Sequence, residues 1–421
     1  MAKKNMKVMG SLLLSASLLL SASVVSASVD ANASEEKVRV LIKSDKAQKA
    51  SLKKEYGARN DFADKGFTTE VTVKQFEALK QNKNLEVSLV DIVSIDAPPS
   101  GGSTRAVPTD RTPWGIESIY KNSAITATTG GAGITVAVLD TGVNINHNDL
   151  VGQSVQCNDF TQRSANIVYN TCNDKNGHGS HVAGTILAHG GNDGLGIYGV
   201  APQADLWAYK VLNDQGSGYS DDIANAIKHA ADQSKATGSK VIISMSLGSA
   251  SKASLIADAV TYANNNGVLV VAAAGNSGPN PGTIGYPGAL VDAVAVAALE
   301  NVQANGTLRV ADFSSRGISG GAGDYKIGEG DVEVSAPGRA IESTWSDGGY
   351  NTISGTSMAT PHISGLAAKI WATNPNLSNA GVRAELQARA KANDILGGLY
   401  AATGDDIASG FGYPTVSSTD K

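Results

Sequence analysis

The sequence has few cysteines, little excess charge of one sign and no long apolar run beyond its first thirty residues. After that point no stretch approaches the roughly 20 apolar residues that a membrane-spanning helix needs, so the body of the protein is not expected to enter a membrane. The net charge of −5, without any cluster of Lys or Arg, argues against a nucleic-acid partner. No segment repeats along the chain, which excludes a solenoid.

The first 33 residues have the composition of a secretory signal peptide. Three lysines precede the apolar run Val8–Leu20, which is too short to span a bilayer, and small residues follow it. The tripeptide at 31–33 (Ala-Asn-Ala) fits the cleavage rule best, and the tripeptide at 25–27 (Val-Ser-Ala) is the second choice. We therefore expect a secreted, extracellular protein.

Export from the cell bears on whether the two cysteines form a disulfide bond. Cys157 and Cys172 are the only pair in the chain, and both lie in the same loop-rich stretch. Because extracellular compartments are oxidising, a disulfide between them is predicted, with two free thiols as the alternative.

The chain after the signal peptide divides into a small unit and a large body. Residues 1–104 carry a balance of +3 and residues 105–421 carry −8. This suits a leader that docks on an acidic body, although chance variation between two solvated surfaces would look the same. A Pro, Gly and Ser-rich linker at 98–104 separates the two parts, which sets the expected boundaries at 34–104 and 105–421. The small unit should contain strands at 38–42, 70–73 and 85–95 and helices at 47–56 and 74–82.

The body alternates continuous apolar runs with helix-like stretches. Runs without polar alternation are typical of strands buried on both faces, and their rhythm with helices indicates a doubly wound parallel α/β sheet with helices on both faces. The expected strands are 134–139, 206–211, 241–245, 268–273 and 293–298, and the expected helices are 221–234, 254–266, 357–373 and 378–389.

Chemistry-bearing residues follow several of these strands, where α/β proteins bind their ligands. Asp140 comes directly after the run 134–139, and Asn276 comes shortly after the run 268–273. His178 and Ser357 each begin a helix-like stretch. A carboxylate, an imidazole, a hydroxyl and an amide donor are the groups that acyl transfer needs.

Each of these groups has a defined role in that chemistry. A neutral imidazole can take the proton of a serine hydroxyl, and a buried carboxylate behind it fixes the tautomer. A serine at a helix N-terminus places its oxyanion beside free backbone N–H groups, and an asparagine amide can donate a second hydrogen bond. The chain order Asp140, His178, Ser357 is one of the three orders in which this geometry occurs.

Three sequence blocks around these residues resemble the signature blocks of the subtilase family. They are Asp-Thr-Gly at 140–142, His-Gly-Ser-His at 178–181 and Gly-Thr-Ser-Met-Ala at 355–359, and the resemblance extends from Pro113 to about Val416. It implies a serine endopeptidase that acts on protein and peptide substrates, with Asn276 as the oxyanion donor, and that works as a monomer. Residues 34–104 are similar to the family's propeptide, an intramolecular inhibitor that also assists folding.

The resemblance also implies where the substrate binds. Two backbone segments would sandwich an extended peptide as an added strand: Gly216, Ser217 and Gly218 on one side, and Ser246, Leu247 and Gly248 on the other. The pocket for the side chain before the scissile bond would be walled by Leu247, Gly248, Ala273, Ala274 and Gly285, with Gly275 beside them. These small uncharged walls imply a preference for large uncharged side chains.

Calcium is the cofactor that the resemblance implies. Asp149 and Asp193 would supply carboxylate oxygens, and Gly191, Leu195 and Ile197 would supply carbonyls, a ligand set that suits Ca²⁺. Asp110 stands where the family usually has an amide ligand, so the maturation cut must fall before it. The acidic loop containing Asp324, Glu329, Asp331 and Glu333 is equally consistent with a second ion and with a solvated surface.

Other functions are less consistent with the sequence. His181 lies three residues after His178, but no Glu or third ligand completes a metal motif, so a structural role is expected. An aspartic peptidase needs a second Asp-Thr-Gly or Asp-Ser-Gly, and none exists. A non-catalytic binding protein on the same fold is the remaining alternative, although all four catalytic residues are present.

Overall fold

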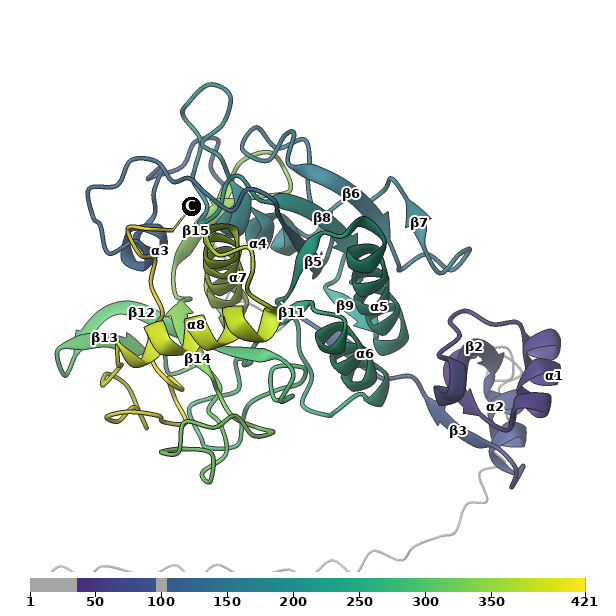
Figure 1. Ribbon diagram of the computed structural model, residues 1–421. Coiled ribbons are helices and arrows are strands. Elements are labelled where there is room, and N and C mark those ends of the chain that lie inside the picture. Colours follow the sequence, from purple (N-terminus) through teal and green to yellow (C-terminus); the bar gives the residue numbers. More distant parts are fainter. Residues whose placement is uncertain (1–35, 96–103, 421) are drawn as a thin grey trace, which may run out of the picture.

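The computed structural model describes residues 36–95 and 104–420. The predicted signal peptide with both possible cleavage sites lies outside the described residues, as does the linker up to residue 103. Figure 1 shows a small unit (purple) beside a much larger body, against whose α5 and α6 side it lies.

The small unit is a three-stranded antiparallel sheet with two helices. The central strand β1(Lys37–Lys43) lies between β2(Phe67–Thr72) and β3(Glu86–Leu89). The helices are α1(Lys46–Tyr56) and α2(Val73–Lys80), and a short 3₁₀ turn, η2, spans Ala63–Lys65. Its own core consists of Val40, Ile42, Phe67, Val71 and Leu79.

Two sequence expectations for the small unit were wrong in their bounds. The strand expected at 70–73 ends at Thr72, because Thr72 and Gln75 form a capping box that starts α2 at residue 73. The closing strand expected at 85–95 is not one strand. It divides into β3 and β4(Ile92–Ser94), because β4 finds its hydrogen-bonding partner in the body, β9(Ser217–Tyr219), and not in β1.

The body is built on a mostly parallel sheet, as predicted. Among the described residues its nine strands follow the order β13-β12-β11-β10-β5-β8-β6-β7, with β14 on β12. Only the β12–β13 and β6–β7 pairs are antiparallel. The strands are β5(Ile134–Asp140), β6(Ser154–Asp159), β7(Val168–Tyr169), β8(Asp205–Lys210), β10(Lys240–Met245), β11(Leu269–Ala273), β12(Val294–Ala304), β13(Thr307–Val310) and β14(Val334–Pro337).

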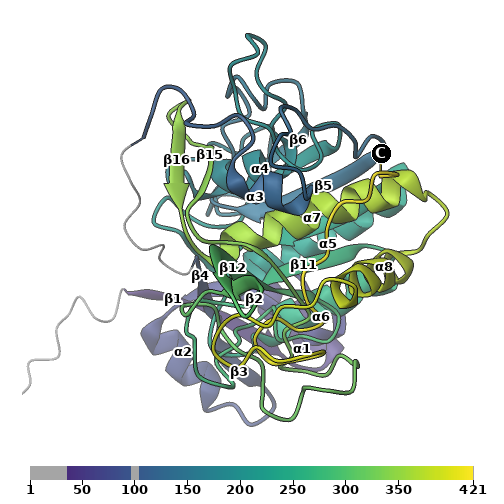
Figure 2. The same cartoon turned by 90° about the vertical axis from the view of Figure 1, so that its left-hand side faces the viewer.

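Helices cover both faces of this sheet, which completes the doubly wound arrangement (Figure 1). One face carries α4(His178–Leu187), α7(Thr356–Thr373) and α8(Asn379–Lys391), and Figure 2 shows α7 and α8 lying across it. The other face carries α5(Ser220–Thr237) and α6(Ser254–Asn265). The remaining elements are α3(Trp114–Ile119) and the hairpin of β15(Ile341–Thr344) and β16(Tyr350–Ile353).

The apolar strands supply a core to each face. In β5, Val136 and Val138 belong to the core under α4 and α7, whereas Ala137 and Leu139 belong to the core under α5 and α6. This explains why the central strands are apolar along most of their length. Within residues 36–95 and 104–420, no helix is both long and apolar enough to cross a membrane.

The predicted disulfide is present. Cys157 of β6 is bonded to Cys172, fifteen residues later, and closes the excursion that contains β7.

Candidate active site

The carboxyl ends of three neighbouring strands form one edge of the body's sheet. Asp140 is the last residue of β5, Ser246 directly follows β10, and Asn276 lies three residues after β11. Because β5, β10 and β11 are parallel neighbours, their ends meet at the same place. Residues from three separate parts of the sequence are thereby brought together.

His178 faces Asp140 at this edge. It is the first residue of α4, and its Nδ1 atom lies 2.8 Å from Oδ1 of Asp140. The same carboxylate oxygen accepts a 2.7 Å hydrogen bond from the backbone N–H of Thr141. A Cβ on Gly179 would lie 2.0 Å from the carbonyl oxygen of Gly142, so only glycine lets the start of α4 approach the loop after β5 this closely.

Asp174 supports this arrangement, although no motif in the sequence predicted it. Its carboxylate is buried and accepts hydrogen bonds from the N–H groups of Gly177 and Ser180, at 2.8 and 2.9 Å, across the first turn of α4. It also accepts a 2.9 Å hydrogen bond from the hydroxyl of Thr141. An acidic residue a few positions before a helix is the kind of start signal that could have identified it.

Ser357 is the second residue of α7 and is held against the end of β10. Its hydroxyl donates a 3.1 Å hydrogen bond to the carbonyl oxygen of Ser246. The hydroxyl of Ser246 in turn donates to the carbonyl oxygen of Ser357 at 2.7 Å. These two hydrogen bonds fix the helix start to the strand end.

The amide of Asn276 borders the same space as the backbone N–H of Ser357. A Cβ on Gly355 would lie 3.2 Å from Nδ2 of Asn276 and 3.6 Å from the backbone N of Ser357. Two hydrogen-bond donors therefore lie close together next to the serine, which is the arrangement that stabilises a developing oxyanion.

Residues 92–95 of the small unit lie on the two segments expected to bind substrate. β4 pairs antiparallel with β9, so that Val93 opposes Gly218. On the other side, Ser94 exchanges two backbone hydrogen bonds with Gly248, at 2.9 and 3.2 Å, and the N–H of Ile95 donates to the carbonyl of Gly216 at 2.9 Å. The chain thus adds its own strand between these segments, a form of β-augmentation.

The residues expected to form the side-chain pocket gather where the loops after β10 and β11 meet. Leu247, Ala273 and Ala274 are buried. Gly285 donates a 2.9 Å backbone hydrogen bond to Ala274, which places it beside these walls. The backbone N–H of Gly275 donates to the hydroxyl of Thr356 at 3.1 Å, next to Ser357.

Asp149 has the environment of a cation ligand. Its Oδ2 atom accepts 2.8 Å hydrogen bonds from the N–H of Ile197 and the hydroxyl of Tyr350, whereas its buried Oδ1 atom has no hydrogen-bond partner. Gly191 and Gly196 enclose that oxygen, since a Cβ on either would lie within 2.8 and 1.8 Å of it. A buried, unpaired carboxylate oxygen is costly unless a cation compensates it, so these residues fit calcium.

Asp193 lies near Asp149, and Asp110 has a different partner. The position of a Cβ on Gly191 is 2.9 Å from Oδ1 of Asp193, which also accepts from the N–H of Leu195 at 2.9 Å. This hydrogen bond is the main reason that the pKa of Asp193 is lowered. Asp110 accepts from the N–H of Thr112 at 2.9 Å.

The acidic side chains alone do not make a metal site. In the part of the chain that the structure describes, no three His, Cys, Asp or Glu side chains gather closely enough to hold a metal ion. Backbone carbonyls would therefore have to complete any calcium site, and the family resemblance implies those of Gly191, Leu195 and Ile197. In the second acidic loop, Glu333 pairs with Arg383 at 2.6 Å and Glu329 pairs with Lys252 at 2.8 Å.

His181 has the role of a core residue. Its Nε2 atom lies 2.9 Å from the carbonyl oxygen of Ile341, and burial lowers its pKa to about 3. His362, on α7, is likewise buried, with Nδ1 2.8 Å from the carbonyl oxygen of Met358 and a pKa lowered by burial to about 4. Both side chains are neutral near pH 7.

A carboxylate, an imidazole and a serine at the carboxyl edge of a parallel sheet are typical of serine hydrolases. Comparison with known proteins agrees with this class. The subtilase family matches residues 131–412, and a subtilisin from Bacillus sp. (strain TA39) is 58% identical over 420 residues, which covers 98% of this chain and all of that relative. Subtilisin Savinase from Lederbergia lenta is 39% identical over 277 residues, which covers 65% of this chain and 90% of the relative.

Two solved structures are also similar. Sphericase is 66% identical with a TM-score of 0.73, and S41 psychrophilic protease is 65% identical with a TM-score of 0.72; each match covers 74% of this chain and all of the other. The chain belongs to the subtilase family. It is a subtilisin-like serine endopeptidase, and its substrates are proteins and peptides.

Proposed function

We propose that the protein is secreted as a precursor and hydrolyses peptide bonds through Asp140, His178 and Ser357. The observation that carries the proposal is the 2.8 Å approach of His178 Nδ1 to Asp140, at the sheet edge where the first turn of α7 holds Ser357. With Nδ1–H donating to the carboxylate, Nε2 of the neutral ring is the basic atom. The sequence of the first 33 residues supports secretion.

The reaction follows from these positions. His178 takes the hydroxyl proton of Ser357 as Oγ attacks the carbonyl carbon, and Asp140 stabilises the imidazolium that forms. The backbone N–H of Ser357 and the side-chain amide of Asn276 donate to the oxyanion. The imidazolium returns the proton to the leaving amine, and an acyl-enzyme remains. Water activated by His178 then releases the acid and restores the serine.

Specificity in this proposal comes from backbone pairing and from the pocket beside Ser357. Gly216–Gly218 and Ser246–Gly248 would hold the substrate as an added strand, as they hold residues 92–95. The uncharged walls formed by Leu247 and Ala274 favour a large uncharged side chain before the scissile bond, because a charged one would be buried without a partner.

The same pairing supports an inhibitory role for the leader, residues 34–104. Residues 92–95 occupy the segments that a substrate would need, so substrate is excluded while the leader is docked. Arg105 already pairs with Tyr350 of the body through two backbone hydrogen bonds, at 2.9 and 2.8 Å, which supports a boundary just before it. The body, residues 105–421, would be the mature peptidase and would act as a monomer.

Calcium completes the proposal as a structural ion. Asp149 and Asp193 would hold it with the carbonyls of Gly191, Leu195 and Ile197, and Asp110 would contribute from the start of the body. The ion would supply positive charge to the unpaired buried oxygen of Asp149.

The decisive experiment is Ser357→Ala. We expect kcat to fall by about 10⁶-fold, the loss known for removal of the nucleophile in subtilisin itself, and the purified precursor to remain uncut. Ser354→Ala, three residues earlier, is the control, and this variant should still hydrolyse peptides and cut its own precursor. A sulfonyl fluoride should inhibit the wild-type protein and label Ser357, and a pepstatin-type inhibitor should have no effect. If wild-type protein hydrolyses no peptide, the non-catalytic alternative is correct.

A further inference from the structure

Two aspartates at the start of α5 are buried beneath the small unit. Asp221 and Asp222 are 0% and 2% exposed, although both lie in the first turn of a helix on the body's surface. The helix dipole favours negative charge at this end. A buried carboxylate is nevertheless costly unless strong donors replace the water it loses.

Arg39 of β1 supplies part of this compensation. Its NH1 group lies 3.1 Å from Asp221 and 2.7 Å from Asp222, so one guanidinium joins both carboxylates. The same guanidinium lies over the ring of Tyr219, 3.9 Å from its centroid. Burial alone would lower the pKa of Arg39, but the two aspartates raise it above its ordinary value, which keeps this arginine charged.

Arg59 occupies a second position shaped for a guanidinium group. Its Nε atom donates to Asp222 at 2.7 Å, while NH1 and NH2 donate to the backbone carbonyls of Gln162 and Phe160, each at 2.7 Å. Each of the three guanidinium nitrogens of Arg59 thus donates one hydrogen bond to the body. The single ammonium of a lysine could not satisfy three acceptors in this way.

Neutral donors from the same unit complete the cluster. Asp221 accepts from the hydroxyl of Thr68 at 2.6 Å and from the amide of Asn60 at 3.1 Å. Asn60 and Thr68 are themselves buried. The two carboxylates are therefore surrounded by matched donors from the leader.

This cluster is continuous with the strand that binds β4. β9 ends at Tyr219, and Asp221 and Asp222 follow within three residues. Between them, the N–H of Ser220 donates to the carbonyl of Asp91 at 2.8 Å, directly before β4. A shift of the leader by one residue along β9 would separate the guanidinium groups from their carboxylates.

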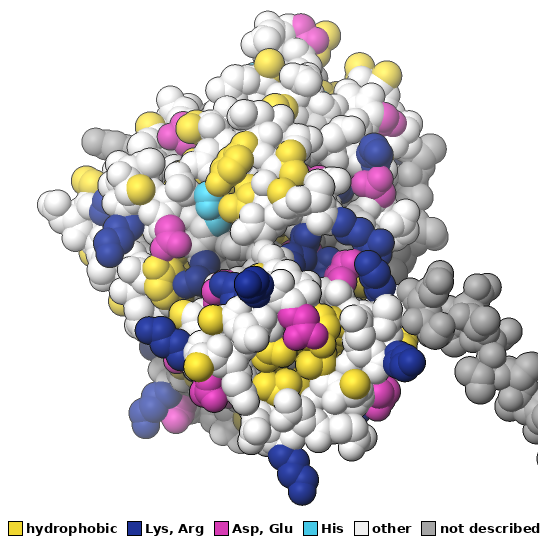
Figure 3. Space-filling view, turned by 90° about the vertical axis from the view of Figure 1, so that its right-hand side faces the viewer, with side chains coloured by type: hydrophobic (Ala, Val, Ile, Leu, Met, Phe, Trp, Pro, Cys, Tyr) yellow, Lys and Arg dark blue, Asp and Glu magenta, His cyan; other side chains and the backbone are white. Residues whose placement is uncertain are grey.

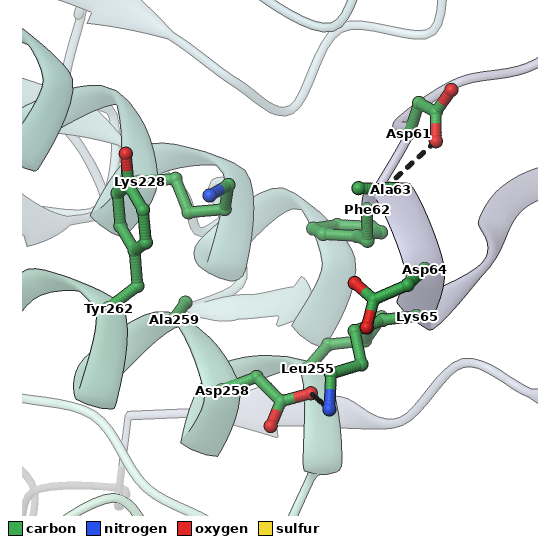
Figure 4. Close-up of a pocket in the computed structure, with 10 residues that line it drawn as sticks. All are labelled: Asp61, Phe62, Ala63, Asp64, Lys65, Lys228, Leu255, Asp258, Ala259 and Tyr262. Atoms are coloured by element: carbon green, nitrogen blue, oxygen red, sulfur yellow. Dashed lines mark hydrogen bonds and ion pairs between the residues drawn. The ribbon is translucent and has the colours of Figure 1, made fainter.

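Outside this cluster, the leader contacts the body through buried apolar side chains, among them Leu41, Phe62 and Val90, and through exposed ion pairs. Phe62 points toward α5 and α6 beside a cavity of about 320 Å³ (Figure 4). The ion pair between Lys65 and Asp258 in the same view is exposed, at 53% and 47%. Figure 3 shows Lys and Arg side chains spread across this side of the molecule with acidic ones among them. Exposed ion pairs of this kind contribute little to the free energy that holds the leader on the body.

We propose that Asp221 and Asp222 form a receptor for the two guanidinium groups of Arg39 and Arg59. The receptor sets the register of the leader on the substrate strand and retains the leader after the chain is cut. This inference rests on the proposed function, in which the leader inhibits the body.

The test measures latency, the delay between adding purified precursor to a chromogenic peptide and the onset of hydrolysis. Asp222→Asn should shorten latency by about 10²–10³-fold, because removing one partner of a buried charge pair mainly speeds release. Arg59→Lys keeps the positive charge but loses the planar guanidinium group with its separate donors, and should shorten latency by about tenfold or more. The matched control is Asp258→Asn, which breaks the exposed pair between the leader and the body and should change latency less than twofold.

Folding is checked separately. Each substitution is also made in Ser357→Ala precursor, which is not expected to digest itself, and its thermal melting is recorded. If Asp222→Asn melts without cooperativity and is therefore not folded, the latency of the Arg59→Lys variant tests the proposal instead. Unchanged latency in a folded Asp222→Asn or Arg59→Lys variant would contradict the proposed receptor. So would an Asp258→Asn variant whose latency is shortened as much as that of Asp222→Asn. Absence of any latency in the wild-type protein would instead refute the inhibitory leader of the proposed function.

Discussion

The side-chain oxygen of Asn276 accepts two hydrogen bonds from Thr356, one from its backbone N–H at 2.9 Å and one from its hydroxyl at 3.1 Å. Because the oxygen is committed to the residue before Ser357, the amide nitrogen is turned toward the serine's side. The orientation of the asparagine is thus set by the helix that carries Ser357, the proposed nucleophile.

This orientation leads to a first prediction. Asn276→Ala should lower kcat by about 10²–10³-fold with little change in KM, which is the effect of removing this type of donor in subtilisin itself. Thr356→Val should give a smaller loss, since it removes only one of the two hydrogen bonds that hold Asn276. Steady-state kinetics on a chromogenic peptide would measure both. A rise in KM with unchanged kcat would assign Asn276 to ground-state binding.

A second prediction concerns specificity. Peptides that differ only in the residue before the scissile bond should be cleaved with a kcat/KM about tenfold or more higher for Phe or Leu than for Asp or Lys, because the walls offer no charge partner. Comparable kcat/KM values for Lys and Phe would show that a charge partner lies within reach of the pocket.

A third prediction concerns calcium. An ion that binds only the native state stabilises it by about 4 kcal/mol at a thousandfold excess over Kd. EDTA should therefore lower the melting temperature of the mature protein and speed its autolysis, and Asp193→Ala should reduce the response to added calcium. Asp258→Asn, which is also exposed but far from this loop in the sequence, should respond like wild type. Identical melting curves in calcium and EDTA would exclude the site.

A fourth prediction concerns pH. Burial lowers the pKa of His362 to about 4, below the ordinary value of about 6.5, so the unfolded chain binds the proton more readily. Neutral His362 therefore makes its full contribution to the free energy of unfolding above pH 6.5. This contribution falls by about 3 kcal/mol in total as the pH falls toward 4. In Ser357→Ala precursor, His362→Gln should flatten the decline in melting temperature between pH 7 and pH 4.5, whereas His189→Gln should not. Parallel declines in all three proteins would contradict this.

Much of the body could be predicted because its central strands are apolar along most of their length. The expected runs at 134–139 and 241–245 match β5 and β10 to within one residue at each end. Shorter strands such as β15 and β16 were missed, since four-residue segments with Glu, Ser, Thr and Asn carry no clear periodicity.

The residues missed near the site are those that act through others. The motifs marked Asp140, His178 and Ser357, but Asp174 is not part of any motif and takes its role from the hydrogen bonds across α4. Nothing in the local sequence of Arg39 and Asp222 links them, since they are 183 positions apart. Only the overall charge difference between the leader and the body pointed to such a contact.

Tyr350 connects the proposed calcium site to the start of the body. Its hydroxyl donates to Asp149, and its backbone pairs with Arg105, near the start of the body. Under the proposed cleavage before Arg105, Tyr350 would link Asp149 to the free end of the mature enzyme. If Asp149 holds calcium as proposed, a molecule that loses the ion would loosen this terminus, and neighbouring enzyme molecules would then cleave it. Depletion of the metal would therefore select which copies of the enzyme are consumed first.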